Sequence, residues 1–168
     1  MIEVSKLYYD RYGISSDKNF SKIDVSPLMN SILSRASVRK FSKKDISQEL
    51  LTLLLTAAQS APSKSNLQQY SILVIQNQAL KKEISSLIGD TKWALTAPVF
   101  LLFLADVRRN IKITKHKGYN HQNNNVDTFM NGVIDAALSM QCMINASESI
   151  GLGICPISMI RNIIEEVK

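Results

Sequence analysis

The spacing of hydrophobic positions along the chain changes between the period of a helix and that of a strand. Residues 48–61 repeat apolar side chains at helical intervals up to a proline, which predicts a helix capped by Asp45 or Ser47. Residues 67–76 have strand length and contain several β-branched side chains, so they predict a strand. Residues 98–105 are apolar throughout, which is typical of a strand buried on both faces.

Helices are expected on both sides of these strands. A short amphipathic helix begins at Pro27, and another helix covers residues 79–88 before Gly89 stops it. The longest helix covers residues 127–150, is about 36 Å long, and is apolar nearly all round. Because such a helix must be covered on every side, it belongs in a core or at an oligomer interface.

The other segments carry little periodicity. Residues 1–26 are polar and mixed and predict an N-terminal arm or short helix, whereas the basic, Asn-rich residues 107–125 predict a loose loop. An extended segment follows the long helix, and a last helix starts near Arg161. Helices and strands intermix without a strict βαβ repeat, so the expected fold class is α+β, with one domain over residues 27–168.

The composition fits a globular protein. The chain has 168 residues, of which 45% are hydrophobic, and its longest strongly apolar run, interrupted by Pro98, is too short to span a bilayer. The first residues carry charges without an apolar stretch, so no signal peptide is visible. Cys142 and Cys155 form no metal or redox motif, and we expect a reduced, cytoplasmic compartment.

The net charge of +6 comes from 20 Lys and Arg residues against 14 Asp and Glu residues. A positive chain can attract nucleic acid, acidic membranes or phosphorylated small ligands. The densest basic runs, at residues 39–44 and 108–117, are not interleaved with aromatic residues, and no nucleic-acid-binding motif accompanies them. We therefore favour a solvated basic face over a nucleic-acid or membrane partner, and a compact phosphate ligand stays open.

Conventional catalytic sets are missing from the sequence. It has no nucleophile elbow, zinc-protease motif, Walker loop or glycine-rich dinucleotide turn. His116 and His121 have no neighbouring carboxylates, so we expect a surface loop rather than a metal site, and Cys142 is expected to be a buried small hydrophobe. An enzyme without such residues would take its chemistry from a cofactor.

Two segments carry side chains suited to a cofactor. Arg35, Ser37 and Arg39 alternate, so an extended backbone would direct two guanidinium groups and a hydroxyl to one face. This set suits a phosphate or a ring carbonyl, and the alternative is an exposed basic strand edge. Residues 61–68 form a helix-to-strand turn rich in short polar side chains, which could present hydroxyls and amides to a planar heterocycle or be only a turn.

Together with three further motifs, these segments resemble the nitroreductase family of flavin enzymes. The motifs occur in the family's order: R-x-S-x-R-x-F at 35–41, A-P-S-x-x-N-x-Q at 61–68, A-P-V at 97–99 followed by Ala-Asp at 105–106, E-S-x-G-L-G at 148–153, and a final segment at 157–162 that ends in Arg-Asn. The subgroup that the chain most resembles is that of NADPH-dependent, oxygen-insensitive nitroreductases and flavin reductases.

The resemblance implies an α+β fold with a central, mostly antiparallel sheet flanked by helices. It also implies a homodimer with the long helix buried at its interface, FMN bound there, and NADPH or NADH as electron donor to nitroaromatic, quinone or flavin acceptors. The family domain extends beyond residue 168, so we expect its C-terminal part to be missing from this chain. The alternative is a truncated, non-catalytic flavin-binding or dimerisation module.

By the same resemblance, Arg35, Ser37 and Arg39 would contact the FMN phosphate, ribityl chain and pyrimidine edge. Four residues would approach the flavin, in part from the partner subunit, and three belong to a stretch along the isoalloxazine ring: Ser63, Ser65, Asn66 and Gln68, then Pro156, Ser158 and Met159. Met159 stands where family members often have glycine, so its side chain is expected over or beside the ring. The alternative is that Met159 faces the core under the long helix.

Overall fold

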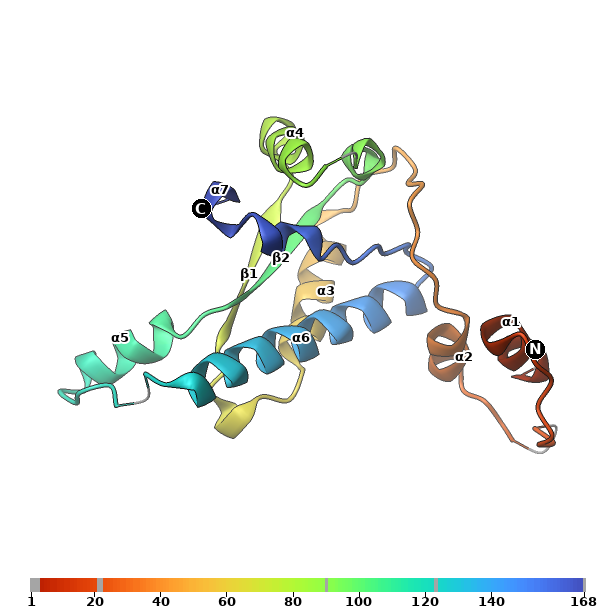
Figure 1. Ribbon diagram of the computed structural model, residues 1–168, viewed down its shortest axis with the longest axis horizontal. Coiled ribbons are helices and arrows are strands. Elements are labelled where there is room, and N and C mark those ends of the chain that lie inside the picture. Colours follow the sequence, from red (N-terminus) through yellow and green to blue (C-terminus); the bar gives the residue numbers. More distant parts are fainter. Residues whose placement is uncertain (1–3, 21–22, 90, 123, 168) are drawn as a thin grey trace.

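The computed structural model describes residues 4–20, 23–89, 91–122 and 124–167 (Figure 1). The predicted helices and strands lie within a few residues of their expected bounds. In chain order the elements are α1 (Val4–Tyr12), α2 (Pro27–Ser34), α3 (Gln48–Gln59), the 3₁₀ helix η1 (Lys64–Asn66), β1 (Tyr70–Ile75), α4 (Gln78–Leu87), η2 (Lys92–Thr96), β2 (Phe100–Ala105), α5 (Arg108–His116), α6 (Val126–Ser149), η3 (Met159–Asn162) and α7 (Ile164–Val167).

The two strands pair in antiparallel fashion, as the α+β expectation requires. Ile72 lies opposite Phe103, so the two side chains share a face of the sheet. That face packs against α3 and α6, where Leu54, Ala58 and Met143 form the buried centre of the core. Half-buried side chains surround this centre: Leu50, Leu55, Ile72, Leu101, Phe103, Ala146 and Leu152.

The expectation that residues 98–105 are buried on both faces is wrong for this chain. Leu104 of β2 is 37% exposed, and Leu73 of β1 is 48% exposed. Only one side of the strand pair contributes Ile72, Leu101 and Phe103 to the packing against α3 and α6. An apolar run indicates that a strand can be covered on both faces, but not that the cover comes from the same chain.

The prediction of a loose loop over residues 107–125 is also wrong, because residues 108–116 form α5. Asp106 starts this helix, since its Oδ1 accepts the backbone N–H of Arg108 at 2.9 Å and its Oδ2 pairs with the guanidinium at 2.9 Å. Arg108 and the Ser71 hydroxyl hold the pKa of Asp106 well below its usual range. Polar contacts therefore hold α5 in place. Such contacts do not require a regular spacing of hydrophobic residues, so the sequence pattern did not reveal this helix.

In its first half, helix α6 buries small and polar residues and exposes large apolar ones, whereas Met143 and Ile144 in its second half are buried. The buried face approaches the strands closely at Gly132, where an added Cβ would lie 3.2 Å from the Ala105 Cβ and 3.3 Å from the Gln69 carbonyl oxygen. The buried residues are Thr128, Gly132, Asp135, Ala136, Ser139, Met143, Ile144 and Ser147. The exposed apolar residues, which we call the outer face of α6, are Val126, Phe129, Met130, Val133, Ile134 and Leu138. The all-round cover expected for this helix is thus not provided within one chain.

Although α6 has 24 residues, the described part of the chain contains no helix that is both long and apolar enough to cross a membrane. Figure 1 shows α6 running between the two ends of the molecule, with α1 and α2 at one end and α5 at the other. Helix α6 is therefore the element that connects the distant parts of the fold.

The segment after α2 runs beside the segment after α6. The backbone N–H of Val38 donates to the carbonyl oxygen of Ile154 at 3.0 Å. Gly153 lies directly against Val38, because a Cβ at Gly153 would be only 2.8 Å from the Val38 Cγ1. The close approach of these two segments therefore requires glycine at this position.

We expect Gly153→Ala to lower the free energy of unfolding by about 1–3 kcal/mol, because the added methyl group would overlap the Val38 side chain. In a Val38→Ala background the same substitution should cost clearly less, since the branched methyl groups are gone. Denaturant unfolding of the four proteins measures both effects. An equal loss of stability in the two backgrounds would show that Val38 is not what Gly153 accommodates.

Candidate functional site

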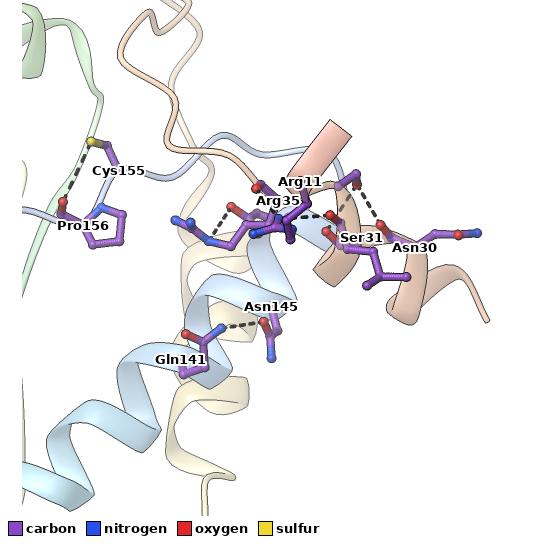
Figure 2. Close-up of polar contacts among 11 residues, drawn as sticks. Arg11, Asn30, Ser31, Arg35, Gln141, Asn145, Cys155 and Pro156 are labelled. Carbon is purple, nitrogen blue, oxygen red and sulfur yellow. Dashed lines mark hydrogen bonds and ion pairs between the residues drawn. The ribbon is translucent and has the colours of Figure 1, made fainter. Parts of the chain in front are cut away.

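Arg35 lies against the C-terminal end of α6. Its Nε is 3.4 Å from the Glu148 Oε1, and the two side chains are only 26% and 11% exposed. The Arg35 carbonyl oxygen accepts a hydrogen bond from the Arg11 guanidinium at 3.1 Å, and Figure 2 shows Arg11 and Arg35 side by side at this end of the helix. Burial raises the pKa of Glu148, and the charge of Arg35 opposes that rise.

These contacts leave one nitrogen of the Arg35 guanidinium without a hydrogen-bond acceptor. Within the described residues, its Nη2 atom is buried and has no hydrogen-bond partner. Leaving a buried cationic donor without an acceptor costs free energy. A phosphate or another anionic group would supply that acceptor.

Ser37 and Arg39 follow on the same segment and are exposed. Val38 between them turns toward Gly153, which anchors the segment while its neighbours stay accessible. Beyond them, the Phe41 ring stacks on Trp93 with 6.4 Å between ring centroids. The segment is thus fixed at both ends, with two of the three predicted cofactor-binding side chains open to solvent.

The loop of residues 63–69, which holds four predicted site residues, has an unusual backbone. Ser65, Asn66 and Gln68 have φ values of 50°, 54° and 48°, the left-handed region that favours glycine. The Ser63 hydroxyl accepts the backbone N–H of Gln68 at 3.2 Å, and the Gln68 side-chain amide donates to the Asn66 Oδ1 at 3.2 Å. Such a conformation persists only where surrounding groups impose it.

Side chains from two helices impose it here. Asp135 of α6 accepts backbone N–H bonds from Lys64 and Gln69, each at 3.0 Å. From α5, the Asn110 amide donates to the Leu67 carbonyl oxygen at 3.2 Å, and Arg109 donates to the carbonyl oxygen of residue 68. Sequence reasoning missed Asp135, although a lone carboxylate inside an otherwise apolar helix is a signal that it is bonded in the interior.

Hollows on the surface lie beside this loop rather than beside Arg35. A shallow one of about 330 Å³ separates the loop from α5 and is lined by Asn66, Leu67, Gln68, Arg109, Asn110, Ile113 and Thr114. A smaller one of about 170 Å³ lies near the start of α6 and is lined by Ala105, Val107, Asn124, Asn125, Thr128, Phe129 and Gly132. Neither contains Arg35, Ser37 or Arg39, so these hollows of the single chain do not join the two predicted halves of the site.

The two halves lie at different levels of α6, one near its middle and one at its C-terminal end. Arg35 pairs with Glu148, whereas the 63–69 loop is bonded to Asp135, which precedes Glu148 by 13 residues or about 20 Å of helix. Figure 1 shows the same separation, with η1 near the start of α6 and α2 near its end. Within one chain the structure therefore does not bring Ser63, Ser65, Asn66 and Gln68 to Arg35, Ser37 and Arg39.

The stretch with Pro156, Ser158 and Met159 starts beside the Arg35 half, at the bond between Val38 and Ile154, and ends near Gly89. Pro156 and Ser158 are exposed, and Figure 2 shows Pro156 beside Cys155. Met159 is 49% exposed, and its Cε lies 3.3 Å from where a Cβ on Gly89 would be. The alternative that Met159 faces the core under α6 is therefore wrong.

Three further features of the sequence can be placed in the structure. Thr91 is buried, and its hydroxyl donates to the Ser85 carbonyl oxygen at 3.2 Å. Cys142, expected to be buried, is half-buried, as is Cys155, and both are free thiols. In the part of the chain that the structure describes, no three His, Cys, Asp or Glu side chains are grouped so that they could hold a metal ion.

Comparison with known proteins identifies relatives that are longer than this chain. The FMN reductase (NADPH) of Bacillus subtilis is 38% identical over 103 residues, which are 60% of this chain and 41% of the relative. The oxygen-insensitive NADPH nitroreductase of Salmonella typhimurium is 36% identical over 101 residues, again 60% of this chain and 40% of the relative. The chain thus spans about two-fifths of the length of these curated relatives.

Comparison with solved structures identifies proteins of a similar kind. The structure of the NfrA1 nitroreductase from Bacillus subtilis matches with a TM-score of 0.80 and 35% sequence identity, over 83% of this chain and 57% of that one. The model of the nitroreductase family matches residues 32–168, a range that includes all of the predicted cofactor-binding residues. The five motifs, the fold and the family match agree, and the chain belongs to the nitroreductase family.

Proposed function

We propose that this chain acts as an FMN-dependent oxidoreductase, which passes hydride from NADPH or NADH through FMN to nitroaromatic, quinone or flavin acceptors. The observation that carries the proposal is the buried Arg35 Nη2, a cationic donor without a partner among the described residues, in a segment that matches the family's cofactor motif. The names of two relatives, an FMN reductase (NADPH) and an oxygen-insensitive NADPH nitroreductase, support the choice of cofactor and donor.

The residues present fit FMN. A phosphate is a strong, doubly accepting partner for a guanidinium, so Arg35 would hold the phosphate with the donor that Glu148 leaves free. Ser37 and Arg39 are exposed on the same segment and can reach the ribityl chain and the pyrimidine edge. The adjacent stretch with Pro156, Ser158 and Met159 would lie along the ring.

Bound FMN would supply the hydride chemistry, so the chain needs no nucleophile of its own. The positive charge of Arg39 would stabilise negative charge at the pyrimidine edge of the ring during reduction. A backbone N–H of the 156–159 stretch would donate toward the ring, whatever side chain stands there. Met159, being half-exposed, would limit how large an acceptor can stack beside the ring.

The site is complete only if a second copy of the chain joins it. The 63–69 loop and the Arg35 half lie about 20 Å apart along α6, so one chain does not bring them together and the loop of a partner would have to approach this chain's Arg35 half. The outer face of α6 offers a surface for a second copy, because Phe129 is 64% exposed and five other apolar residues lie beside it. Contiguous exposed apolar surface of this kind marks an interface.

The purified chain should bind FMN and its flavin colour should bleach when NADPH is added without oxygen.

Arg39→Ala is expected to weaken FMN binding by about 1.5–3 kcal/mol, or about 10- to 150-fold in Kd, because a charge-assisted hydrogen bond is lost. Arg35→Ala should have at least that effect, since it also leaves Glu148 without its partner. FMN titration followed by flavin fluorescence measures both.

Lys40→Ala is the matched control, since Lys40 is the exposed neighbour of Arg39 and its loss changes the net charge equally. We expect its FMN affinity to stay within about twofold of the unaltered chain. If the Arg35 and Arg39 variants bind FMN as tightly as the unaltered chain does, this assignment of the site is wrong. A chain that never binds FMN would remove the proposed function itself.

Dimerisation through α6 makes a separate prediction. Val133→Asp puts a carboxylate in the middle of the outer face, and its burial without a partner should dissociate the dimer at micromolar concentration. Leu80→Asp is the control, because Leu80 is 44% exposed but lies in the first turn of α4, where an acidic residue is tolerated. Sedimentation velocity distinguishes the species. A well-folded monomer in the unaltered chain would contradict the dimer.

A further inference from the structure

The 63–69 loop is closed by one buried side chain. Asp135 is 1% exposed, and its two oxygens are used separately, with Oδ1 accepting the N–H of Lys64 and Oδ2 that of Gln69, each at 3.0 Å. These two amides lie on either side of Ser65, Asn66 and Gln68, the three residues of the loop with positive φ. A single carboxylate therefore fixes the distance between the ends of the loop.

The chemistry of the contact requires a carboxylate. An ionised carboxylate is an acceptor at both oxygens, so it can take both N–H groups at once. An asparagine at 135 would keep the shape but turn an NH₂ group toward one of the two amides, and two donors would then face each other in the interior. The contact can thus be removed with almost no change in volume.

Backbone carbonyls of the same loop are held from the opposite side. Asn110 donates to Leu67 at 3.2 Å, and Arg109 donates to the carbonyl oxygen of residue 68. Two of the loop's N–H groups are thus bound by α6 and two of its carbonyl groups by α5. With both sides fixed, the left-handed residues between them keep one conformation.

We propose that Asp135 is a positioning residue for the flavin, acting through the loop that it closes. By binding the amides of Lys64 and Gln69, it sets the backbone from which Ser65, Asn66 and Gln68 meet FMN. The inference rests on the proposed function for its ligand, whereas the effect on the loop itself is independent of FMN. Because Asp135 and the outer face are parts of the same helix, docking of a partner on α6 also fixes where this loop lies.

The test compares Asp135→Asn with Asp127→Asn in the full chain. Asp127 is a matched control, since it is an exposed carboxylate on the same helix that accepts a hydrogen bond from the Asn131 side chain at 2.8 Å. Hydrogen exchange of the ligand-free protein should be at least about tenfold faster at the amides of Lys64 and Gln69 in the Asp135 variant, with the core amides of α3 unchanged. Its FMN Kd should rise at least about tenfold, while the Asp127 variant matches the unaltered chain in both.

Unchanged exchange in the loop of the Asp135→Asn protein would overturn the proposal, and so would weaker FMN binding without faster exchange. If the unaltered chain binds no FMN, the proposed function fails, and the exchange result still decides whether Asp135 holds the loop. Asp135→Ser, which keeps one acceptor oxygen and adds no bulk, replaces Asp135→Asn if circular dichroism shows that the latter does not fold. The same increase in exchange is expected for it, and normal exchange in that protein would equally overturn the proposal.

Discussion

The close packing of the buried face of α6 is the constraint on which the rest of the structure depends. Gly132 lets the helix approach the strand pair until an added Cβ would touch Ala105, and the same face carries Asp135 to the 63–69 loop. Further along, Glu148 meets Arg35. Because small and polar residues occupy this face in the first half of α6, the large apolar residues there, from Val126 to Leu138, are left outside, where a second chain can cover them.

The spacing of hydrophobic residues predicted the helices and strands that apolar packing stabilises. It did not predict the helix that polar contacts stabilise. Helix α3 and helix α6 repeat apolar residues, and both lie near their expected bounds. The first residue of helix α5 is bonded by the Asp106 carboxylate, and the helix is fixed by side chains that bond a neighbouring loop, so no apolar repeat reveals it. The apolar run over β2 also gave no sign that one face of the strand pair would stay partly exposed in this chain.

The candidate site was predictable only as a set of motifs. Resemblance to the family named Arg35 and the polar turn at 61–68, but the sequence alone does not indicate that they contact one helix about 20 Å apart. The left-handed backbone at Ser65 and Asn66 was unpredictable as well, because neither residue is glycine and the conformation depends on Asp135, more than sixty residues away in the chain. Long-range polar contacts, rather than local preference, shape this part of the molecule.

The central claim, that one FMN site is built from two chains, is tested most directly by mixing two defective proteins. Arg39→Ala impairs one half, and Asn66→Gly impairs the other while tolerating the left-handed backbone. After subunit exchange at equal concentrations, half of the dimers are mixed and one of the two sites in each is intact, so about a quarter of the normal tight FMN binding should return. If the mixture binds FMN no better than the separate proteins, although sedimentation with a labelled chain shows that subunits have exchanged, then both halves act within one chain and the account is wrong.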